Sequence, residues 1–137
     1  RIEKKVDHYK GRRDNMIARF NRVVDRSQQI IDVLKSKGYP TELVAALEED
    51  LITLKGMIAK YGNDIDPAIR KLEEANDYNC GDSEGAFRGR FEEGRDLLKV
   101  AHADVKDIKA FFKSEIKPDI EALKDAKQLH SPSPSVQ

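Results

Sequence analysis

The sequence predicts an all-α fold, specifically an antiparallel up-down-up three-helix bundle with coiled-coil-type heptad packing. Three observations support this prediction. Apolar residues alternate at spacings of three and four over three long stretches, which is the pattern of helices that supercoil around one another. Glycine, proline and short polar segments separate the three stretches. Charged residues make up 36% of the 137-residue chain, a composition typical of long helices.

The first helix is expected at residues 2–37. Ile17, Val24 and Ile31 lie one residue beyond alternate inward positions, and they widen the apolar stripe. A stripe of this width predicts contact with two partner helices rather than one. Gly38 should end the helix, because glycine adopts the left-handed C′ conformation without strain. The inward positions, which we call the seam, are Ile2, Val6, Tyr9, Arg13, Met16, Phe20, Val23, Ser27, Ile30 and Leu34.

The second helix is expected at residues 42–77, with Thr41 as its N-cap. The loop before it is short, so the helix should return alongside the first. Pro67 interrupts the pattern chemically but leaves its phase intact, so we expect a kink at residues 62–66 with helix on both sides. The alternative is a break in which Asp66 caps a new helix. The seam continues through Val44, Leu47, Leu51, Leu54, Ile58, Tyr61, Ile65, Ala68, Leu72 and Ala75.

The third helix is expected at residues 84–128, after a turn at residues 78–82. Its apolar spacing becomes 4-4 between Phe112 and Ile120, which is a local slip of the heptad phase. Pro118 lies inside that slip, so we predict a second kink there. The seam of this helix is Phe87, Phe91, Gly94, Leu98, Ala101, Val105, Ile108, Phe112, Ile116, Ile120 and Leu123.

The three helices and their turns predict one domain at residues 1–129. Residues 130–137 are rich in Ser and Pro and have no apolar face, so we expect them to form a disordered tail. No stretch approaches the ~18 apolar residues of a transmembrane helix, and no signal peptide is recognisable. The chain begins at Arg1 rather than Met, so we expect that a preceding segment has been removed.

The heptad pattern also predicts the core and the partner of one inward cation. Arg13 occupies a seam position, and a buried guanidinium without a partner would be too costly to persist. Its head group should therefore reach solvent or a carboxylate, with Glu73 or Asp66 as the expected partner. Gly89 and Gly94 are expected to allow the close approach of a neighbouring helix. The residues predicted to be largely buried are Phe20, Ile30, Leu51, Leu54, Ile58, Phe91, Leu98, Val105 and Ile108.

Charge is unevenly distributed along the chain, although the net charge is zero. Residues 1–37 carry 11 Lys/Arg against 5 Asp/Glu, residues 38–77 carry 4 against 9, and residues 78–137 carry 10 against 11. A basic helix beside an acidic one favours their pairing. The basic residues between Lys10 and Arg26 are the best candidates for binding nucleic acid, but helical rotation should spread them around the helix. No exposed aromatic residues are interleaved with them for base stacking, so nucleic acid is disfavoured as a partner.

We predict no catalytic, cofactor-binding or metal-ligating residues. None of the three His residues follows a Glu by three positions, as the Glu-x-x-His motif of di-iron bundles requires. The acidic clusters at residues 48–50, 73–77 and 92–96 lie off the seam, where carboxylates usually pair with cations one turn away. Residues 81–85 lack the Gly-Lys-Ser/Thr ending of a phosphate-binding loop. The expectation is a chain that is not an enzyme and uses no cofactor.

Cys80 is the only cysteine, and it falls in the polar turn between the second and third helices. In an up-down-up bundle this turn lies at the same end as the N-terminus, so Cys80 is expected to lie close to Arg1. A cysteine upstream of Arg1 could then form a disulfide with Cys80, which would imply an oxidising compartment. The alternative is a free, partly buried thiol.

Three segments carry a resemblance to a known family. The first runs from Arg19-Phe20-Asn21 to Thr41, the second covers residues 79–87 with the pattern Cys-Gly-x-Ser-Glu-Gly-x-Phe, and the third covers residues 116–124. Together they are similar to small exported helical-bundle proteins of unknown function, from bacteria known mainly through metagenomes. The resemblance implies a signal peptide and a cysteine near the start of the first helix, but no activity. Pro67 and the Ser-Pro tail depart from the family's pattern.

The leading hypothesis is a non-enzymatic extracytoplasmic helical-bundle domain, periplasmic or at the cell surface, that serves as a structural spacer or protein-interaction module. Its partner would be an unidentified protein, and the chain itself would be a monomer or a weak homo-oligomer. The alternative is a cytosolic regulatory or nucleic-acid-associated helical bundle, which a salt-dependent gel shift would reveal. A small-ligand enzyme is a third hypothesis. A bundle cavity of several hundred Å³ with convergent polar groups would favour it.

Overall fold

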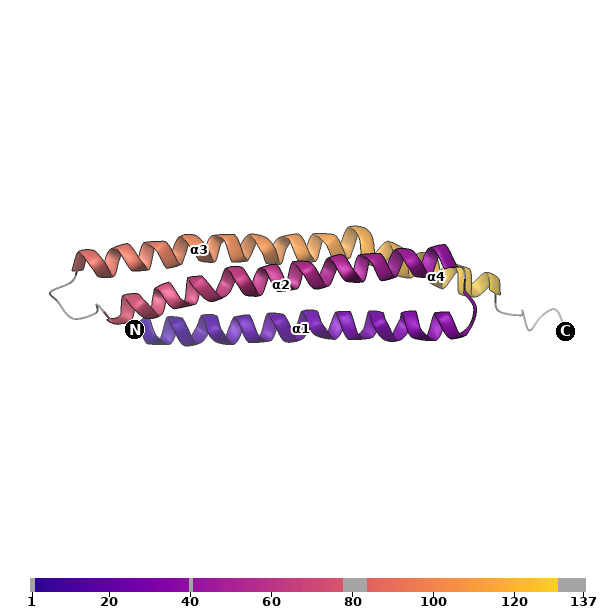
Figure 1. The fold of residues 1–137 in the computed structure, drawn as a ribbon, viewed down its shortest axis with the longest axis horizontal. Helices are drawn as coiled ribbons and strands as arrows, with labels where there is room; N and C mark the ends of the chain where they lie inside the picture. Colours follow the sequence, from indigo (N-terminus) through magenta and orange to yellow (C-terminus); the bar gives the residue numbers. More distant parts are fainter. Residues whose placement is uncertain (1, 40, 78–83, 131–137) are drawn as a thin grey trace.

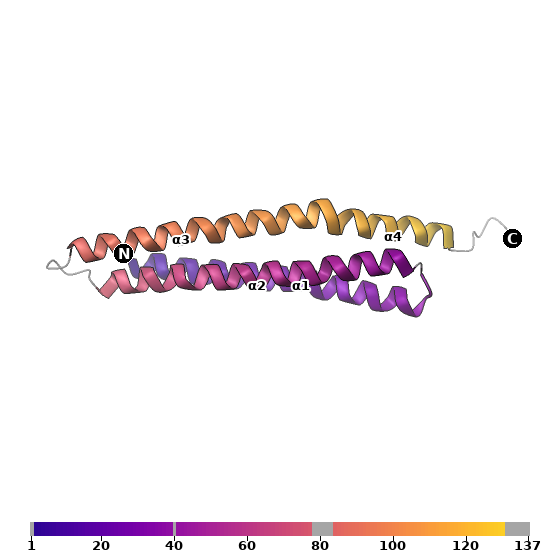
Figure 2. The ribbon, with the colours of Figure 1, turned by 45° about the horizontal axis from the view of Figure 1, so that its top comes forward.

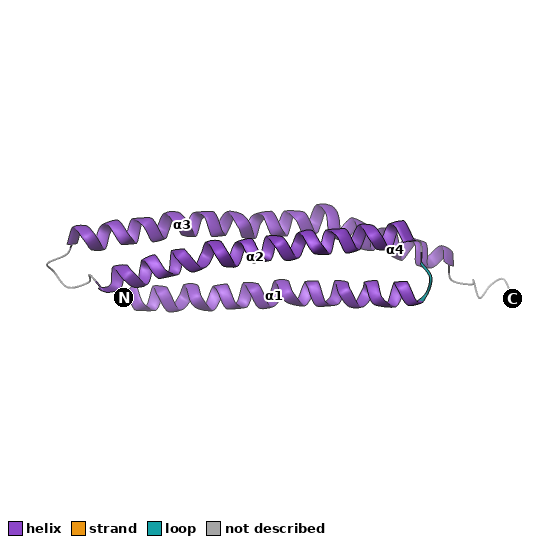
Figure 3. Cartoon of the chain, viewed as in Figure 1, coloured by secondary structure: helices purple, strands orange, loops and turns teal. Residues whose placement is uncertain are grey.

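Three long helical rods make up the part of the chain that the structure describes. The computed structural model describes residues 2–39, 41–77 and 84–130, and within these ranges only residues 37–39 are not helical. The elements are α1 (Ile2–Ser36), α2 (Thr41–Asp77), α3 (Glu84–Phe111), the π-helix η1 (Phe112–Ile116) and α4 (Lys117–His130). The last three follow one another without a loop and form the third rod (Figure 1). The all-α prediction is confirmed, because the rods pack against one another and the described residues contain no strand (Figure 3).

Helix α2 is the central element. Its Cα atoms lie within 8 Å of Cα atoms in α1, α3, η1 and α4. Among the described residues, no Cα atom of α1 comes that close to α3, η1 or α4. Figure 1 shows α1 starting at the end of the molecule where α2 stops and α3 starts. Ion pairs fit this arrangement, since Lys10 Nζ lies 3.0 Å from Glu73 Oε2 and Lys35 Nζ lies 2.7 Å from Glu48 Oε2.

The C-terminus of α1 is closed by a Schellman motif. Gly38 has a φ of 71°, the left-handed conformation that was expected of it. The Tyr39 N–H donates to the Leu34 carbonyl at 3.2 Å, and the Gly38 N–H donates to the Lys35 carbonyl at 3.3 Å. These two bonds satisfy carbonyls that have no partner within the helix. The helix ends at Ser36, one residue before the expected position.

Helix α2 continues through Pro67 without a break, so the alternative in which Asp66 caps a new helix is wrong. The seam explains the continuity. Ile65, Ala68 and Leu72 are all buried, and their spacing of three and four is unchanged across the proline. A break would move one of these side chains out of the core, so burial favours a single helix despite the backbone hydrogen bond that proline removes.

The slip in the third seam corresponds to the π-helix η1. The Lys117 N–H bonds to the Phe112 carbonyl, which is the i→i+5 pattern of a π-turn. The wider turn accommodates the 4-4 spacing, and Ile116 and Leu123 beyond Phe112 are both buried. The axis of the third rod changes direction at η1 (Figure 2). The second kink was predicted at Pro118, and the structure places it in the turn just before that proline.

The core matches most of the predicted seam. Phe20, Leu51, Leu54, Ile58, Leu98 and Ile108 are buried, as predicted. Phe91 and Val105 are only half-buried, although both pack against the core. The prediction for Ile30 was wrong, since it is 36% exposed while the neighbouring Ile31 is 0% exposed.

The error at Ile30 has a physical cause in the central position of α2. On α1 the buried residues beyond Phe20 are Val24, Ser27, Ile31 and Leu34, which form a stripe facing α2. The predicted wide stripe is present in the sequence, but only this part of it packs closely against another helix. The other part, which includes Val23 and Ile30, turns toward α3 and α4, whose backbones lie beyond 8 Å.

Gly94 allows the close approach of α3 to α2, as expected. A Cβ atom at this position would lie 2.9 Å from Leu72 Cγ and 3.2 Å from the Ala68 carbonyl oxygen. Gly89 does not have this role, because a Cβ there would meet no atom within 4 Å. Only one of the two predicted glycines is therefore at a helix–helix contact.

Some predictions fall on residues that the structure leaves undescribed. Cys80, its turn at residues 78–82, Arg1 and the tail from Ser131 onward lie outside the described ranges. The described part of the tail is His130, which ends α4 two residues beyond the expected helix end. No helix within the described ranges has the length and apolarity to cross a membrane.

Candidate functional site: a basic groove between α1 and the third rod

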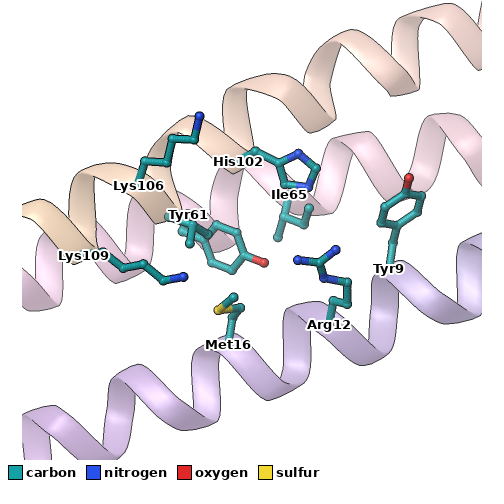
Figure 4. Close-up of a pocket in the computed structure, with 9 residues that line it drawn as sticks. Tyr9, Arg12, Met16, Tyr61, Ile65, His102, Lys106 and Lys109 are labelled. Carbon is teal, nitrogen blue, oxygen red and sulfur yellow. The ribbon is translucent and has the colours of Figure 1, made fainter.

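A hollow of about 330 Å³ lies between α1 and α3, with α2 as its floor (Figure 4). Polar side chains from all three helices converge on it. The residues that line it are Tyr9, Arg12, Met16, Tyr61, Ile65, His102, Val105, Lys106 and Lys109. A cavity of several hundred Å³ with convergent polar groups was expected to favour a small-ligand enzyme. This hollow contains cations, phenols and an imidazole but no carboxylate, so its chemistry suits an anionic group.

Tyr61 is the side chain of this hollow that is held in place by packing against the core. It is 3% exposed, and its ring meets Phe20 edge to face, with centroids 6.4 Å apart and planes at 89°. In Figure 4 its hydroxyl and the guanidinium of Arg12 point toward one another across the hollow. Burial raises the pKa of the Tyr61 phenol, and the charges of Arg12 and Arg13 oppose that rise. The phenol is therefore neutral at physiological pH and available as a hydrogen-bond donor.

Two further hollows continue the first along α1. One of about 280 Å³ is lined by Arg19, Phe20, Val23, Leu54, Ile108, Lys109 and Phe112. One of about 400 Å³ is lined by Arg26, Gln29, Ile30, Val33, Leu34, Ile120, Leu123 and Lys124. We call the three hollows together the α1/α3 groove. It exists because α1 and the third rod both pack on α2 and stand apart from each other.

A row of cations lines the groove, although these basic residues were expected to be spread around the helix. Arg12, Arg19 and Arg26 all line it, because a spacing of seven residues is close to two helical turns and returns to the same face. The expectation that rotation would spread the basic residues was therefore wrong for these three. The seven-residue repeat was the signal that could have identified them.

Arg13 lies on another face and is paired as predicted. Its Nη1 donates to Asp66 Oδ1 at 3.2 Å, and its Nε donates to Asp14 Oδ1 at 3.0 Å. The side chain is 25% exposed, so its stem covers the edge of the core while its head meets carboxylates. Of the two expected partners, Asp66 is the one that binds it, and Glu73 binds Lys10 instead.

A buried carboxylate between α2 and α3 was missed by the sequence reading. Asp104 is 6% exposed, and its Oδ1 accepts a hydrogen bond from Lys60 Nζ at 2.8 Å. Lys60 also donates to Asp64 at 2.8 Å. Burial raises the pKa of Asp104, and Asp64 adds to the rise, while the Lys60 hydrogen bond opposes it. The heptad pattern placed the apolar Val105 at the inward position, so it gave no reason to expect that the neighbouring Asp104 would be buried.

A second acidic contact joins α2 to the third rod. Asp50 Oδ2 is buried and has no hydrogen-bond partner. Burial raises the pKa of Asp50 to about 7, and the neighbouring carboxylates Asp119, Glu115 and Glu49 add to the rise. Asp119 lies within hydrogen-bond reach of Asp50, so a proton held between the two carboxylates would relieve their repulsion. Neither carboxylate lines the α1/α3 groove.

The described residues contain no group of three His, Cys, Asp or Glu side chains placed to hold a metal ion. Cys80, the one candidate disulfide residue, lies outside those residues. Comparison with known proteins finds no matching family model, no matching curated protein and no matching solved structure.

Proposed function

We propose that this chain is a non-enzymatic helical-bundle domain that serves as a protein-interaction module rather than only as a spacer. Its architecture is proposed to be an antiparallel up-down-up bundle with heptad packing. The ion pairs that join opposite ends of α1 and α2 support the chain directions, and the 3-4 spacing of the buried residues supports the packing.

The observation that carries the interaction function is the uncovered α1/α3 groove. Ile30 is 36% exposed and Val33 is 50% exposed, and both line its third hollow. A purely structural spacer gains nothing from leaving an apolar channel open between two of its helices. Contiguous apolar surface with a polar rim is instead typical of protein-binding sites.

The interaction function can be tested with a displayed library of helical peptides of about 25 residues, the number that matches the groove at ~1.5 Å per residue. Apolar positions are fixed at heptad spacing, and the remaining positions vary among acidic, basic and neutral residues. We expect saturable binders that lose at least about tenfold in affinity to the Ile30→Glu/Val33→Glu variant. Ile52→Glu is the matched control, since Ile52 is 71% exposed on α2 and lines no part of the groove. Recovery of no binder of any charge would reject the interaction module.

The extracytoplasmic location is proposed on the family resemblance and on Cys80. The residues encoded before Arg1 test it. We expect a signal peptide and a cysteine within about three residues upstream of Arg1. Non-reducing electrophoresis of the mature protein should then show an intramolecular disulfide. A precursor without either feature would reject this location.

A small anionic ligand is a second candidate function, favoured by the hollow in Figure 4. The convergence of Arg12, Tyr61 and Lys109 suits a carboxylate or phosphate group. A thermal-shift titration with inorganic phosphate and with citrate tests it, because a ligand that binds the folded state raises the melting temperature. The rise should disappear in Arg12→Ala and persist in Arg70→Ala, which removes an exposed cation outside the hollow. Equal rises in both variants would exclude the site.

A further inference from the structure

We infer that the α1/α3 groove accepts a fourth helix from a partner protein, and that this helix is amphipathic with acidic residues beside its apolar stripe. The inference rests on the proposed interaction function and adds the chemical class of the partner.

The apolar side chains that α1 and the third rod contribute to the groove are only partly covered. Met16, Val23, Phe112 and Ile120 pack against the core but remain half-buried. They belong to the three hollows, which follow one another from Tyr9 to Val33 along α1. That stretch measures roughly 36 Å at 1.5 Å per residue. An apolar lining of this length matches the apolar stripe of a helix of about 24 residues.

The charged residues that line the groove favour an acidic helix as its partner. Six cations line the three hollows, and none of the lining residues is a carboxylate. The six cations are Arg12, Arg19 and Arg26 on α1, Lys106 and Lys109 on α3, and Lys124 on α4. The arginines recur roughly every 10 Å along the groove. Glutamates at seven-residue intervals on an incoming helix would recur at the same distance and would face them, as in charge-paired coiled coils.

The same features argue against other occupants. A second copy of this chain placed groove to groove would bring two rows of cations together. A single fatty acid carries charge at one end only, whereas the cations run along the whole groove. Nucleic acid would match the cations, but its phosphates would also lie against Val23, Ile30 and Phe112, which offer them no hydrogen bonds.

Two designed peptides of about 25 residues test the inference, since that length spans the groove at ~1.5 Å per residue. Both carry Leu at the a and d positions. One has Glu at every e and g position, which also prevents it from pairing with itself, and the other has Lys there. We expect the Glu peptide to bind at least about tenfold more tightly than the Lys peptide at low salt, with the difference shrinking as salt rises. Fluorescence anisotropy gives both affinities.

The protein variants make the test specific to the groove. Arg12→Glu/Arg19→Glu/Arg26→Glu should lose about tenfold or more in affinity for the Glu peptide and gain affinity for the Lys peptide. A gain of binding cannot come from a variant that fails to fold. The matched control is Arg70→Glu, which reverses an exposed cation on α2 that lines none of the hollows and should leave both affinities unchanged.

The outcomes separate this inference from the proposed function. If the two peptides bind with equal affinity, or the Lys peptide binds more tightly, the groove binds helices but the acidic partner is wrong. If neither binds and the helix library also yields nothing, the interaction module itself fails. Tighter binding of a duplex oligonucleotide than of the Glu peptide, abolished in the triple variant, would overturn the inference in favour of nucleic acid. Dimerisation of the chain that covers the groove, seen by sedimentation, would also overturn it.

Discussion

Leu72 on α2 fills the space beside Gly94 on α3, so that a Cβ atom at position 94 would lie 2.9 Å from both Cγ and Cδ2 of the leucine. The backbone of α2 is also close, because the Ala68 carbonyl oxygen would lie 3.2 Å from the same Cβ. A methyl group at this position therefore requires the Leu72 side chain or the two helices to shift. The contact explains why a glycine occupies the interior of a long helix, where it is otherwise unfavourable.

Gly94→Ala should destabilise the fold by up to about 2 kcal/mol, because an overpacking cost of about 1–3 kcal/mol is offset in part by the ~1 kcal/mol gain in helix propensity. Gly89→Ala in the same helix is the control. It meets no atom within 4 Å and should stabilise the protein by up to about 1 kcal/mol. Urea denaturation followed by circular dichroism measures both. Equal stabilisation by the two substitutions would show that α3 does not approach α2 at Gly94.

Ile31→Ala and Ile30→Ala test which part of the α1 stripe faces the core. Ile31 is 0% exposed, so its truncation should cost about 2–5 kcal/mol. Ile30 is 36% exposed beside an open hollow, so its truncation should cost at most about 1.5 kcal/mol. Chemical denaturation of the two variants gives the comparison. A larger loss at Ile30 would mean that α1 is rotated about its axis relative to this structure.

Lys60 should stabilise the fold because its charge neutralises the buried Asp104 carboxylate. Lys60→Met leaves Asp104 with Asp64 as its nearest charged neighbour, so the variant should be destabilised most at high pH, where Asp104 is ionised. At low pH the protonated carboxyl needs no cation, and the loss should be small. Lys55→Met is the control, since Lys55 makes no ion pair among the described residues. Similar losses in both variants at pH 8 would argue against the buried pair.

The raised pKa of Asp50 predicts a pH dependence of stability. Its pKa is about 7 in the folded protein against 3.8 as the ordinary value, so the folded state binds more protons between these two pH values. Stability should therefore fall as pH rises from about 4 to 7 and then level off. Asp50→Asn should flatten this slope, because the amide has no proton to lose. Melting temperatures at intervals across this range measure the slope, and an unchanged slope in the variant would place the titrating group elsewhere.

The heptad pattern predicted the helices and most of the core, but not which neighbour each seam residue would face. Spacing defines an inward stripe without stating how closely each flanking helix approaches. In this protein both outer helices turn their buried stripes toward α2. Ile31 is buried instead of Ile30 on α1, and Asp104 is more buried than Val105 on α3. Both discrepancies have this one cause.

The groove could not be predicted for the same reason. Arg12 and Arg19 were visible in the sequence, but they line a groove only because α1 stands apart from the third rod. Gly94 illustrates what decides such distances, since a single missing side chain lets α3 close on α2. Arg13, by contrast, was predicted correctly, because a cation in a seam needs a carboxylate within reach whatever the spacing of the helices.

Methyl NMR of the protein titrated with the Glu peptide shows whether the α1/α3 groove is the surface that binds the peptide. The methyl signals of Met16, Val23, Ile30 and Val33 should shift, because these residues line the three hollows. Those of Ile52 and Val100 should stay in place, since both are exposed apolar side chains outside the groove. Larger shifts at Ile52 or Val100 than at the groove residues would contradict the claim that the α1/α3 groove is the binding surface.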